Sequence, residues 1–158
     1  MAEDMKMSQG RVVFDTLCKA LDNNSWKYQK DEADLSIECS ARGDDLPMDL
    51  YVKVDEDRKI LLLLSNMPFV VSEDKRLDFA IAVSLINNVL VDGSFDFDIK
   101  TGHMFFRMTN SYIESVIGED LINYMLVCSC STIDEYNDKL FMLAKGLITI
   151  DKFIETAV

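Results

Sequence analysis

The sequence predicts an α+β domain in which helices cover one face of a five-stranded antiparallel sheet. Apolar residues change along the chain from helical spacing, with a period of 3.6, to strand-like alternation and back again. The connections between the strand-like segments are short, which favours antiparallel neighbours over parallel crossovers. A length of 158 residues, with only 6 Gly and 2 Pro, fits a single domain over residues 1–158.

The first expected element is an amphipathic helix that begins after Ser8, a residue type that caps helix N-termini. Its apolar residues recur three and four positions apart, as on one buried face of a helix. They are Val13, Phe14, Leu17, Cys18 and Leu21. We expect the helix to end at Asp22-Asn23-Asn24, because short polar side chains compete with the helical backbone for hydrogen bonds.

Three strands follow and form an antiparallel meander. Residues 34–40 and 48–54 alternate apolar and polar side chains, so each strand has one buried face and one wet face. A short polar connection leads to the third strand at 59–65. Its continuous apolar run from Ile60 to Leu64 predicts that both of its faces are covered.

A second helix and a β-hairpin come next. Residues 79–90 are apolar on so wide a helical face that we expect the helix to be mostly buried. It ends at Asp92-Gly93. The strands at 95–99 and 103–109, joined by a tight turn at Lys100-Thr101-Gly102, complete the five strands.

The C-terminal part is helical again, from about residue 119 to Gly146. The sequence leaves open whether this is one long helix or a helix pair, since Thr132-Ile133-Asp134-Glu135 matches a capping box that would start a second helix. Residues 147–158 are expected to form a helical extension beyond a core of about residues 10–146.

Charge excludes several classes of partner. The chain carries 28 Asp and Glu against 16 Lys and Arg, a formal net charge of -12. Nucleic acids and anionic membranes are disfavoured, because both are bound mainly through Lys and Arg. The apolar run at 60–64 is too short to span a bilayer, and Met1-Ala2-Glu3-Asp4 is unlike a secretory signal. We therefore expect a cytoplasmic protein.

No catalytic or metal site is predicted, and no cofactor. The four cysteines are expected to be free and mostly buried: Cys18, Cys39, Cys128 and Cys130. Cys128-Ser129-Cys130 matches half of a structural zinc shell, but residues two apart on a helix point in different directions. A cysteine nucleophile would need His103, the only histidine, as its base. His103 directly follows a hairpin turn, where a side chain is usually exposed to solvent. Asp96 and Asp98 share the wet face of a strand.

The order of helix, three strands, helix, two strands and long helix resembles the bacterial YbjN-like family of proposed sensory transduction regulators. The fold of that family is like that of type III secretion chaperones. The most similar residues are 77–88 (LDFAIAVSLINN), 93–98 (GSFDFD) and 103–107 (HMFFR), and the resemblance spans about residues 10–146. Residues after Gly146 extend past the usual pattern.

The resemblance implies a non-enzymatic protein-binding module with a chaperone-like or regulatory role in a bacterial cytoplasm. Its partner would be a protein or peptide, and the chaperones it resembles are usually dimeric. A homodimer is therefore expected, through either the long helix or a sheet edge. The alternative function is a small-molecule-sensing regulatory domain, which would need a closed pocket with a few convergent polar groups.

Candidate partner-binding residues come from the last strand. Phe106 lies on one face of it with two methionines, whereas Phe105 and Arg107 lie on the other. A strand that is apolar on both faces has one face in the core and the other covered by a helix or offered to a partner. The predicted partner-binding residues are Tyr51, Phe105 and Arg107.

Overall fold

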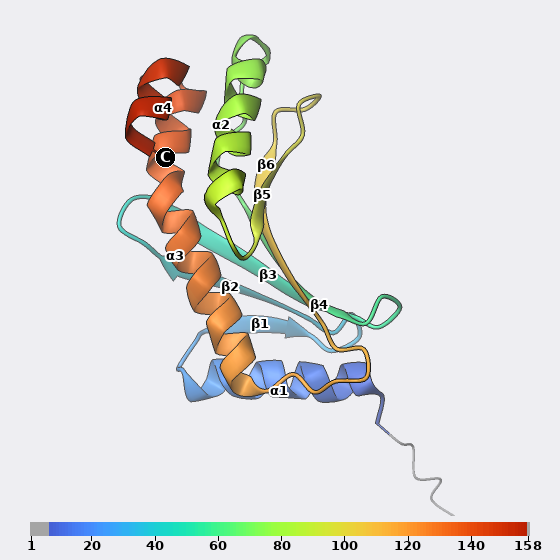
Figure 1. Cartoon of the computed structure of the whole chain (residues 1–158). Helices are drawn as coiled ribbons and strands as arrows, with labels where there is room; N and C mark the ends of the chain where they lie inside the picture. The colour runs from blue at the N-terminus through green and yellow to red at the C-terminus, as the bar shows by residue number, and fades with distance from the viewer. Residues whose placement is uncertain (1–6, 158) are drawn as a thin grey trace, which may run out of the picture.

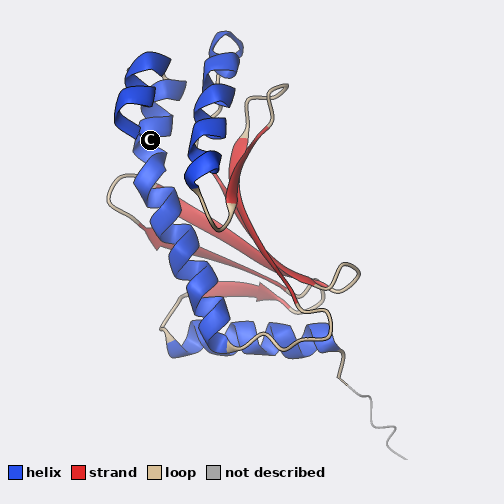
Figure 2. Ribbon diagram, in the orientation of Figure 1, coloured by secondary structure: helices blue, strands red, loops and turns tan. Residues whose placement is uncertain are grey.

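The computed structural model describes residues 7–157 and consists of four α-helices packed on one face of a six-stranded sheet (Figures 1 and 2). The strand order is β1-β2-β3-β4-β6-β5, and every neighbouring pair is antiparallel. The elements in chain order are α1 (Gln9–Asn23), β1 (Tyr28–Asp31), β2 (Ser36–Arg42), β3 (Pro47–Asp55), β4 (Ile60–Asn66), α2 (Arg76–Val89), β5 (Ser94–Phe97), β6 (Met104–Ser111), α3 (Glu119–Ala144) and α4 (Ile150–Ala157). The predicted α+β class is confirmed.

Helix α1 begins and ends close to where the sequence predicts. The backbone N–H of Arg11 donates to Ser8 Oγ at 3.1 Å, so Ser8 caps the helix. At the other end, Asn24 Nδ2 donates to the carbonyl of Ala20 at 2.8 Å. The face expected to be buried packs into the core through Val13, Phe14, Leu17 and Leu21.

Strand β1 was not predicted, so the sheet has six strands instead of the expected five. Its sequence, Tyr28-Gln29-Lys30-Asp31, is polar, and three of its four residues are exposed, so it carries no alternating apolar signal. Backbone pairing defines it instead, from Tyr28 opposite Cys39 to Asp31 opposite Ser36. A short polar strand at this position shields part of the sheet edge.

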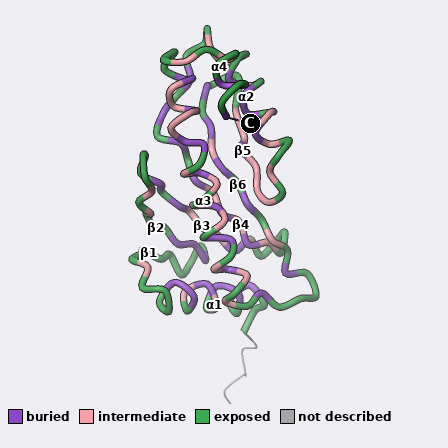
Figure 3. The backbone as a smooth tube through the Cα atoms, turned by 60° about the vertical axis from the view of Figure 1, so that its left-hand side comes forward, coloured by how far each residue is buried: buried purple, intermediate pink, exposed green. Residues whose placement is uncertain are grey.

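The burial of β4 corrects a second prediction. Leu61 and Leu63 point into the core, but Ile60, Leu62 and Leu64 on the opposite face are only partly buried. The buried residues of all four helices belong to the same core cluster as Leu61 and Leu63. The helices therefore cover one face of the sheet, as the sequence predicts, and the second face of β4 is not covered by any helix among residues 7–157 (Figure 3).

Helix α2 is less buried than predicted. Phe79, Ala82, Val83 and Ile86 pack into the core, on the side of the helix that contacts β5 and α4. The opposite side has no neighbour among the described residues, and Leu77 and Ile81 on that side are 72% and 50% exposed. Apolar composition alone predicted burial, whereas the packing leaves one side of α2 uncovered.

One continuous helix, α3, forms most of the C-terminal part, which settles the question of one helix or two. The expected start at Thr132-Ile133-Asp134-Glu135 is not used. Instead Ser129 is fully buried within the helix and its Oγ lies 3.7 Å from Met108 Sδ on β6. Tertiary burial thus overrides a weak local signal. The following helix α4 buries Phe153 in the common core.

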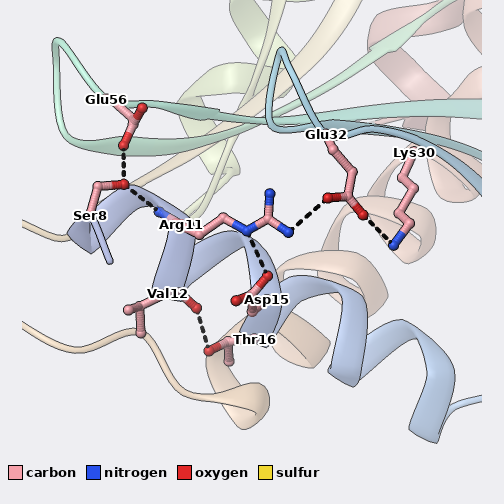
Figure 4. Close-up of polar contacts among 8 residues, drawn as sticks. All are labelled: Ser8, Arg11, Val12, Asp15, Thr16, Lys30, Glu32 and Glu56. Carbon is pink, nitrogen blue, oxygen red and sulfur yellow. Dashed lines mark hydrogen bonds and ion pairs between the residues drawn. The ribbon is translucent and has the colours of Figure 1, made fainter. Parts of the chain in front are cut away.

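A cluster of ion pairs connects α1 with the β1–β2 turn (Figure 4). Arg11 Nε lies 3.1 Å from Asp15 Oδ1, and Arg11 Nη2 lies 2.8 Å from Glu32 Oε2. Lys30 Nζ lies 2.7 Å from Glu32 Oε1. Hydrogen bonds from Lys30 and Arg11 lower the pKa of Glu32 to about 2. Glu32 therefore favours the folded state while it is ionised.

Replacing Glu32 with Gln is expected to lower the free energy of unfolding slightly at pH 7. Because the folded pKa lies below the unfolded value of 4.5, this contribution is present above pH 4.5 and is lost as the pH falls towards 2. The effect is small because these groups are exposed to solvent. Urea unfolding of both proteins across this pH range measures it, with Glu135→Gln as the control at an exposed helical carboxylate. A difference between wild type and Glu32→Gln that stays constant with pH would contradict the assignment.

Candidate functional site

The sheet face opposite the helices is the candidate site, and we call it the outer face. Alternation along the strands directs one set of side chains to it: Tyr51 and Lys53 of β3, Leu62, Leu64 and Asn66 of β4, Phe105, Arg107 and Thr109 of β6, and Asp96 of β5. The register aligns them across strands, with Tyr51 opposite Leu64 and Leu64 opposite Arg107. Phe105 lies opposite Asn66 on one side and Asp96 on the other. The structure thus places all three predicted binding residues on one surface.

Polar contacts hold the side chains of the outer face in place. Arg107 Nε lies 2.7 Å from Asp96 Oδ2. Asp34, in the β1–β2 turn, accepts hydrogen bonds from Lys53 Nζ at 2.5 Å and from the Tyr51 hydroxyl at 3.0 Å. Hydrogen bonds from Lys53 and Tyr51 lower the pKa of Asp34, while burial raises the pKa of Tyr51. The charges of the outer face are therefore largely paired, and the ring of Tyr51 is held at one position.

A groove of about 930 Å³ is hollowed into the outer face over β1 to β4, and it lies open to solvent. Its lining mixes apolar and polar residues: Lys27, Tyr28, Gln29, Glu38, Cys39, Ser40, Asp49, Leu50, Tyr51, Leu64 and Asn66. Tyr51 belongs to the groove, whereas Phe105 and Arg107 lie beyond it on β6. The outer face therefore continues beyond the groove, across β4 to β6.

One side of this groove meets an unpaired length of strand. β1 pairs with β2 only between Ser36 and Cys39, but β2 continues to Arg42. The N–H of Val54 donates to the carbonyl of Leu35, so odd-numbered residues of β2 bond with β3. Ser40 and Arg42 consequently direct their backbone groups away from β3, at the end of β2 that β1 leaves open.

A second apolar surface follows the exposed side of α2. Its members are spaced four residues apart, and we call them the α2 stripe: Leu77, Ile81, Leu85 and Val89. Residues 81–91 contain no charged side chain. The sequence predicted Ile81 and Leu85 to lie on the buried face, because periodicity does not show which side of an apolar helix lacks a neighbour.

The cysteine and histidine side chains of the described residues do not gather at one place. All four cysteines are free, and one is buried while three are partly buried. Burial raises the pKa of Cys39 to about 12 and that of Cys130 to about 11, so both thiols stay protonated at neutral pH. His103 is exposed. Within residues 7–157, no three His, Cys, Asp or Glu side chains form a cluster that could hold a metal ion.

Among the described residues, none of the helices combines the length and apolar character needed to cross a bilayer.

Three known structures have a fold similar to that of this chain. The HopA1–SchA chaperone–effector complex contains a chain that matches with a TM-score of 0.58 and 12% identity, covering 82% of this chain and 95% of that one. YbjN from E. coli, proposed to be a transcription regulator, matches with a TM-score of 0.56 and 15% identity over 80% and 92% of the two chains. The chain has the YbjN-like, type III secretion chaperone-like fold.

The ExsC–ExsE complex supports the same assignment, with a TM-score of 0.55, 15% identity and coverage of 85% of this chain and 97% of that one. The sequence-level resemblance to this fold is confirmed. At these identities the likeness establishes the fold alone. No protein-family model matches the chain, and no curated protein matches it in sequence.

Proposed function

We propose that this protein is a non-enzymatic binding module that holds an extended segment of a partner polypeptide on its outer face. The observation that carries the proposal is the row formed by Tyr51, Leu64 and Arg107, which lies in register across three strands, with Phe105 beside Arg107 on the same face of β6. No helix among the described residues covers this row. Partly exposed apolar and aromatic side chains gathered on one surface are typical of interaction sites.

An extended polypeptide suits the geometry of the site. The backbone groups of Ser40 and Arg42 that face away from β3 have no partner within residues 7–157 and offer hydrogen bonds beside the groove. The groove offers space for side chains. Peptides that add to a sheet edge use these two kinds of contact together. A chaperone-like or regulatory role in a bacterial cytoplasm is consistent with this mode of binding, and the HopA1–SchA neighbour is a chaperone–effector complex.

A small-molecule-sensing domain is the second candidate. The volume of the groove, about 930 Å³, favours it, because ligand pockets have volumes in the same range. Its openness counts against it, since ligand pockets enclose most of the ligand surface. The buried polar residues Ser65 and Asn137, whose side chains lack hydrogen-bond partners among the described residues, do not line the groove. We therefore favour a polypeptide partner.

Binding on the outer face is tested by NMR with a captured partner. The protein is used to retain polypeptides from lysate of its source cells, and a retained polypeptide is purified and added to isotope-labelled protein. Backbone signals of Tyr51, Leu64 and Phe105 are expected to shift, while those of the helix α1 residue Val12 stay unchanged. Shifts confined to the helices would refute the outer face, and shifts caused only by a small molecule from the lysate would favour the sensor.

We further propose that the α2 stripe mediates self-association. Two copies of a chain with a net charge of -12 repel each other, so they associate most readily through a surface free of charge. Residues 81–91 provide such a surface, and a single helical stripe can pack against its own copy around a two-fold axis.

Replacing Ile81 with Asp is expected to convert the dimer into a monomer. The substitution places one carboxylate on each side of a two-fold interface, where the two charges meet without a partner. Light scattering measures the mass in solution. The control is Val12→Asp, which alters a comparably exposed apolar residue on α1. A dimer that persists in Ile81→Asp, or a wild-type protein that is monomeric at all concentrations, would refute the stripe as an interface.

A further inference from the structure

A second unpaired length of strand lies at the opposite side of the sheet. β5 pairs with β6 only between Met104 and Arg107, whereas β6 continues to Ser111. β5 begins only at Ser94, and Gly93 directly before it has a φ of +73°, a turn conformation. The preceding residue, Asp92, accepts a hydrogen bond from the Tyr124 hydroxyl of α3. The turn before β5 is thus tied to α3.

The hydrogen-bond pattern shows which backbone groups this leaves without a partner. The N–H of Met67 donates to the carbonyl of Met104, and the N–H of Tyr112 donates to the carbonyl of Lys59, so even-numbered residues bond on the β4 side. Odd-numbered residues bond on the β5 side, as His103 does with Asp98. Thr109 and Ser111 therefore direct their N–H and C=O groups to the side that β5 does not reach. Both residues are exposed, and their backbone groups have no hydrogen-bond partner among the described residues.

Exposed apolar side chains lie on the segments next to this edge. Val91, in the segment that leads from α2 into β5, is 95% exposed. Ile113, which follows β6, and Tyr124, which contacts Asp92, are also exposed. An added strand alternates its side chains between the two sheet faces, so one set of them would meet these apolar groups.

The charge around the edge selects the occupant. Residues 108–120 contain three acidic side chains and no basic one, and residues 89–98 also contain three acidic side chains and no basic one. Glu119 is paired with Lys19, and Asp96 with Arg107. Asp92, Glu114 and Asp120 have no ion-pair partner among the described residues. A segment carrying Lys or Arg is complementary to this edge, whereas an acidic segment is repelled.

We propose that the free edge of β6 at Thr109–Ser111 is a docking site for a short, extended, basic segment of a partner polypeptide, which adds to the sheet as a further strand beside β6. The backbone groups of Thr109 and Ser111 pair with those of the segment, apolar side chains contact Val91 and Tyr124, and basic side chains meet the acidic rim. The site lies towards the opposite edge of the sheet from the groove and does not depend on the binding proposed there.

The test uses a fluorescent eight-residue peptide of alternating Val and Lys, with a Val and Glu peptide of the same length as its comparison. Fluorescence anisotropy measures binding to the full chain. The Val–Lys peptide is expected to bind at least tenfold more tightly than the Val–Glu peptide, and added salt is expected to weaken it. Equal binding of both peptides, or no binding of the Val–Lys peptide, would overturn the proposal.

Two variants locate the binding. Thr109→Pro removes an N–H that points away from β4, so the β4–β6 ladder remains intact while the edge loses a donor. Thr109→Pro is expected to lower the affinity for the Val–Lys peptide at least tenfold. Thr109→Val keeps the N–H and is expected to leave this affinity unchanged. Leu64→Asp alters the outer face and is also expected to leave binding of the Val–Lys peptide unchanged. Loss of binding in Leu64→Asp but not in Thr109→Pro would place the peptide on the outer face and overturn the proposal.

A further peptide keeps the test decisive if Thr109→Pro does not fold. A Val–Lys peptide with N-methylated backbone positions on one side cannot donate the edge hydrogen bonds, and it is expected to bind the wild-type protein at least tenfold more weakly. Unchanged binding of this peptide would overturn the proposal. Light scattering of Thr109→Val and Thr109→Pro adds a last check, because loss of a dimer only in the proline variant would show that a second copy occupies the edge, which also overturns it.

Discussion

Replacing Phe105 with Asp is expected to reduce partner binding at least tenfold, which corresponds to about 1.4 kcal/mol of binding free energy. Phe105 is a half-buried aromatic residue of the outer face, between Asn66 of β4 and Asp96 of β5. Aromatic residues of this kind dominate the binding energy of many interfaces. The introduced carboxylate would also lose its hydration when a partner covers it, and this adds to the loss.

A second variant separates the loss of binding from a loss of folding. Asp at position 105 lies directly opposite Asp96, and like charges in that arrangement weaken strand pairing. Leu64→Asp avoids this problem, because Leu64 lies between Tyr51 and Arg107 and the new carboxylate has a cation beside it. Both variants are expected to lose binding while their urea unfolding transitions remain cooperative.

The measurement is the amount of a defined partner polypeptide that each variant retains, followed by titration with the purified partner. Val116→Asp is the matched control, since Val116 is 89% exposed in the loop before α3 and lies outside the outer face. It is expected to bind as the wild type does. Retained binding in Leu64→Asp, or an equal loss in Val116→Asp, would contradict the outer face as the binding surface.

Local signals explain why much of the fold was predictable. Ser8 and the spacing of Phe14 and Leu17 are sufficient to place α1, because the cap and the buried face are encoded within a few residues. The hairpin of β5 and β6 is equally local, since Gly102 has the positive φ that its turn requires. Features that depend on distant partners were missed. β1 is polar and exists through its pairing with β2, and the uncovered side of α2 depends on which helices lie elsewhere.

The candidate site was predictable only in part for the same reason. Alternation alone places Phe105 and Arg107 on the face opposite Phe106. Register is not encoded in one strand, so the alignment of Tyr51, Leu64 and Arg107 in one row appears only in the structure. Leu64 was missed because an unbroken apolar run predicts burial on both faces, and only the absence of a covering layer among the described residues shows otherwise.

Replacing Gly93 with Ser is expected to lower the free energy of unfolding by about 2 to 4 kcal/mol. The φ of +73° at this position is unfavourable for any residue with a Cβ, at a cost of about 1 kcal/mol. A Cβ would also lie well inside van der Waals contact with the ring of Phe106, which is fully buried. Forcing extra atoms into a packed core costs about 1 to 3 kcal/mol more.

Urea unfolding measures this effect, and the same substitution at another glycine controls for it. Gly118 has a φ of -92° at the N-terminus of α3, and a Cβ there would meet nothing within 4 Å. Since Ser is favoured at helix N-caps, Gly118→Ser is expected to stay within about 0.5 kcal/mol of the wild type. A change below about 1 kcal/mol in Gly93→Ser would contradict the packing of this turn against Phe106.

The backbone and packing contributions at Gly93 are separable by experiment. Asn tolerates a positive φ better than Ser, so Gly93→Asn retains mainly the clash with the ring of Phe106. Combining Gly93→Ser with Phe106→Leu removes part of that ring, and the two changes together are expected to destabilise the protein by less than the sum of their separate effects. Additive effects would place the cost in the backbone alone. A coupling of about 1 kcal/mol or more would instead show that close packing on Phe106 holds the turn that leaves the β6 edge open.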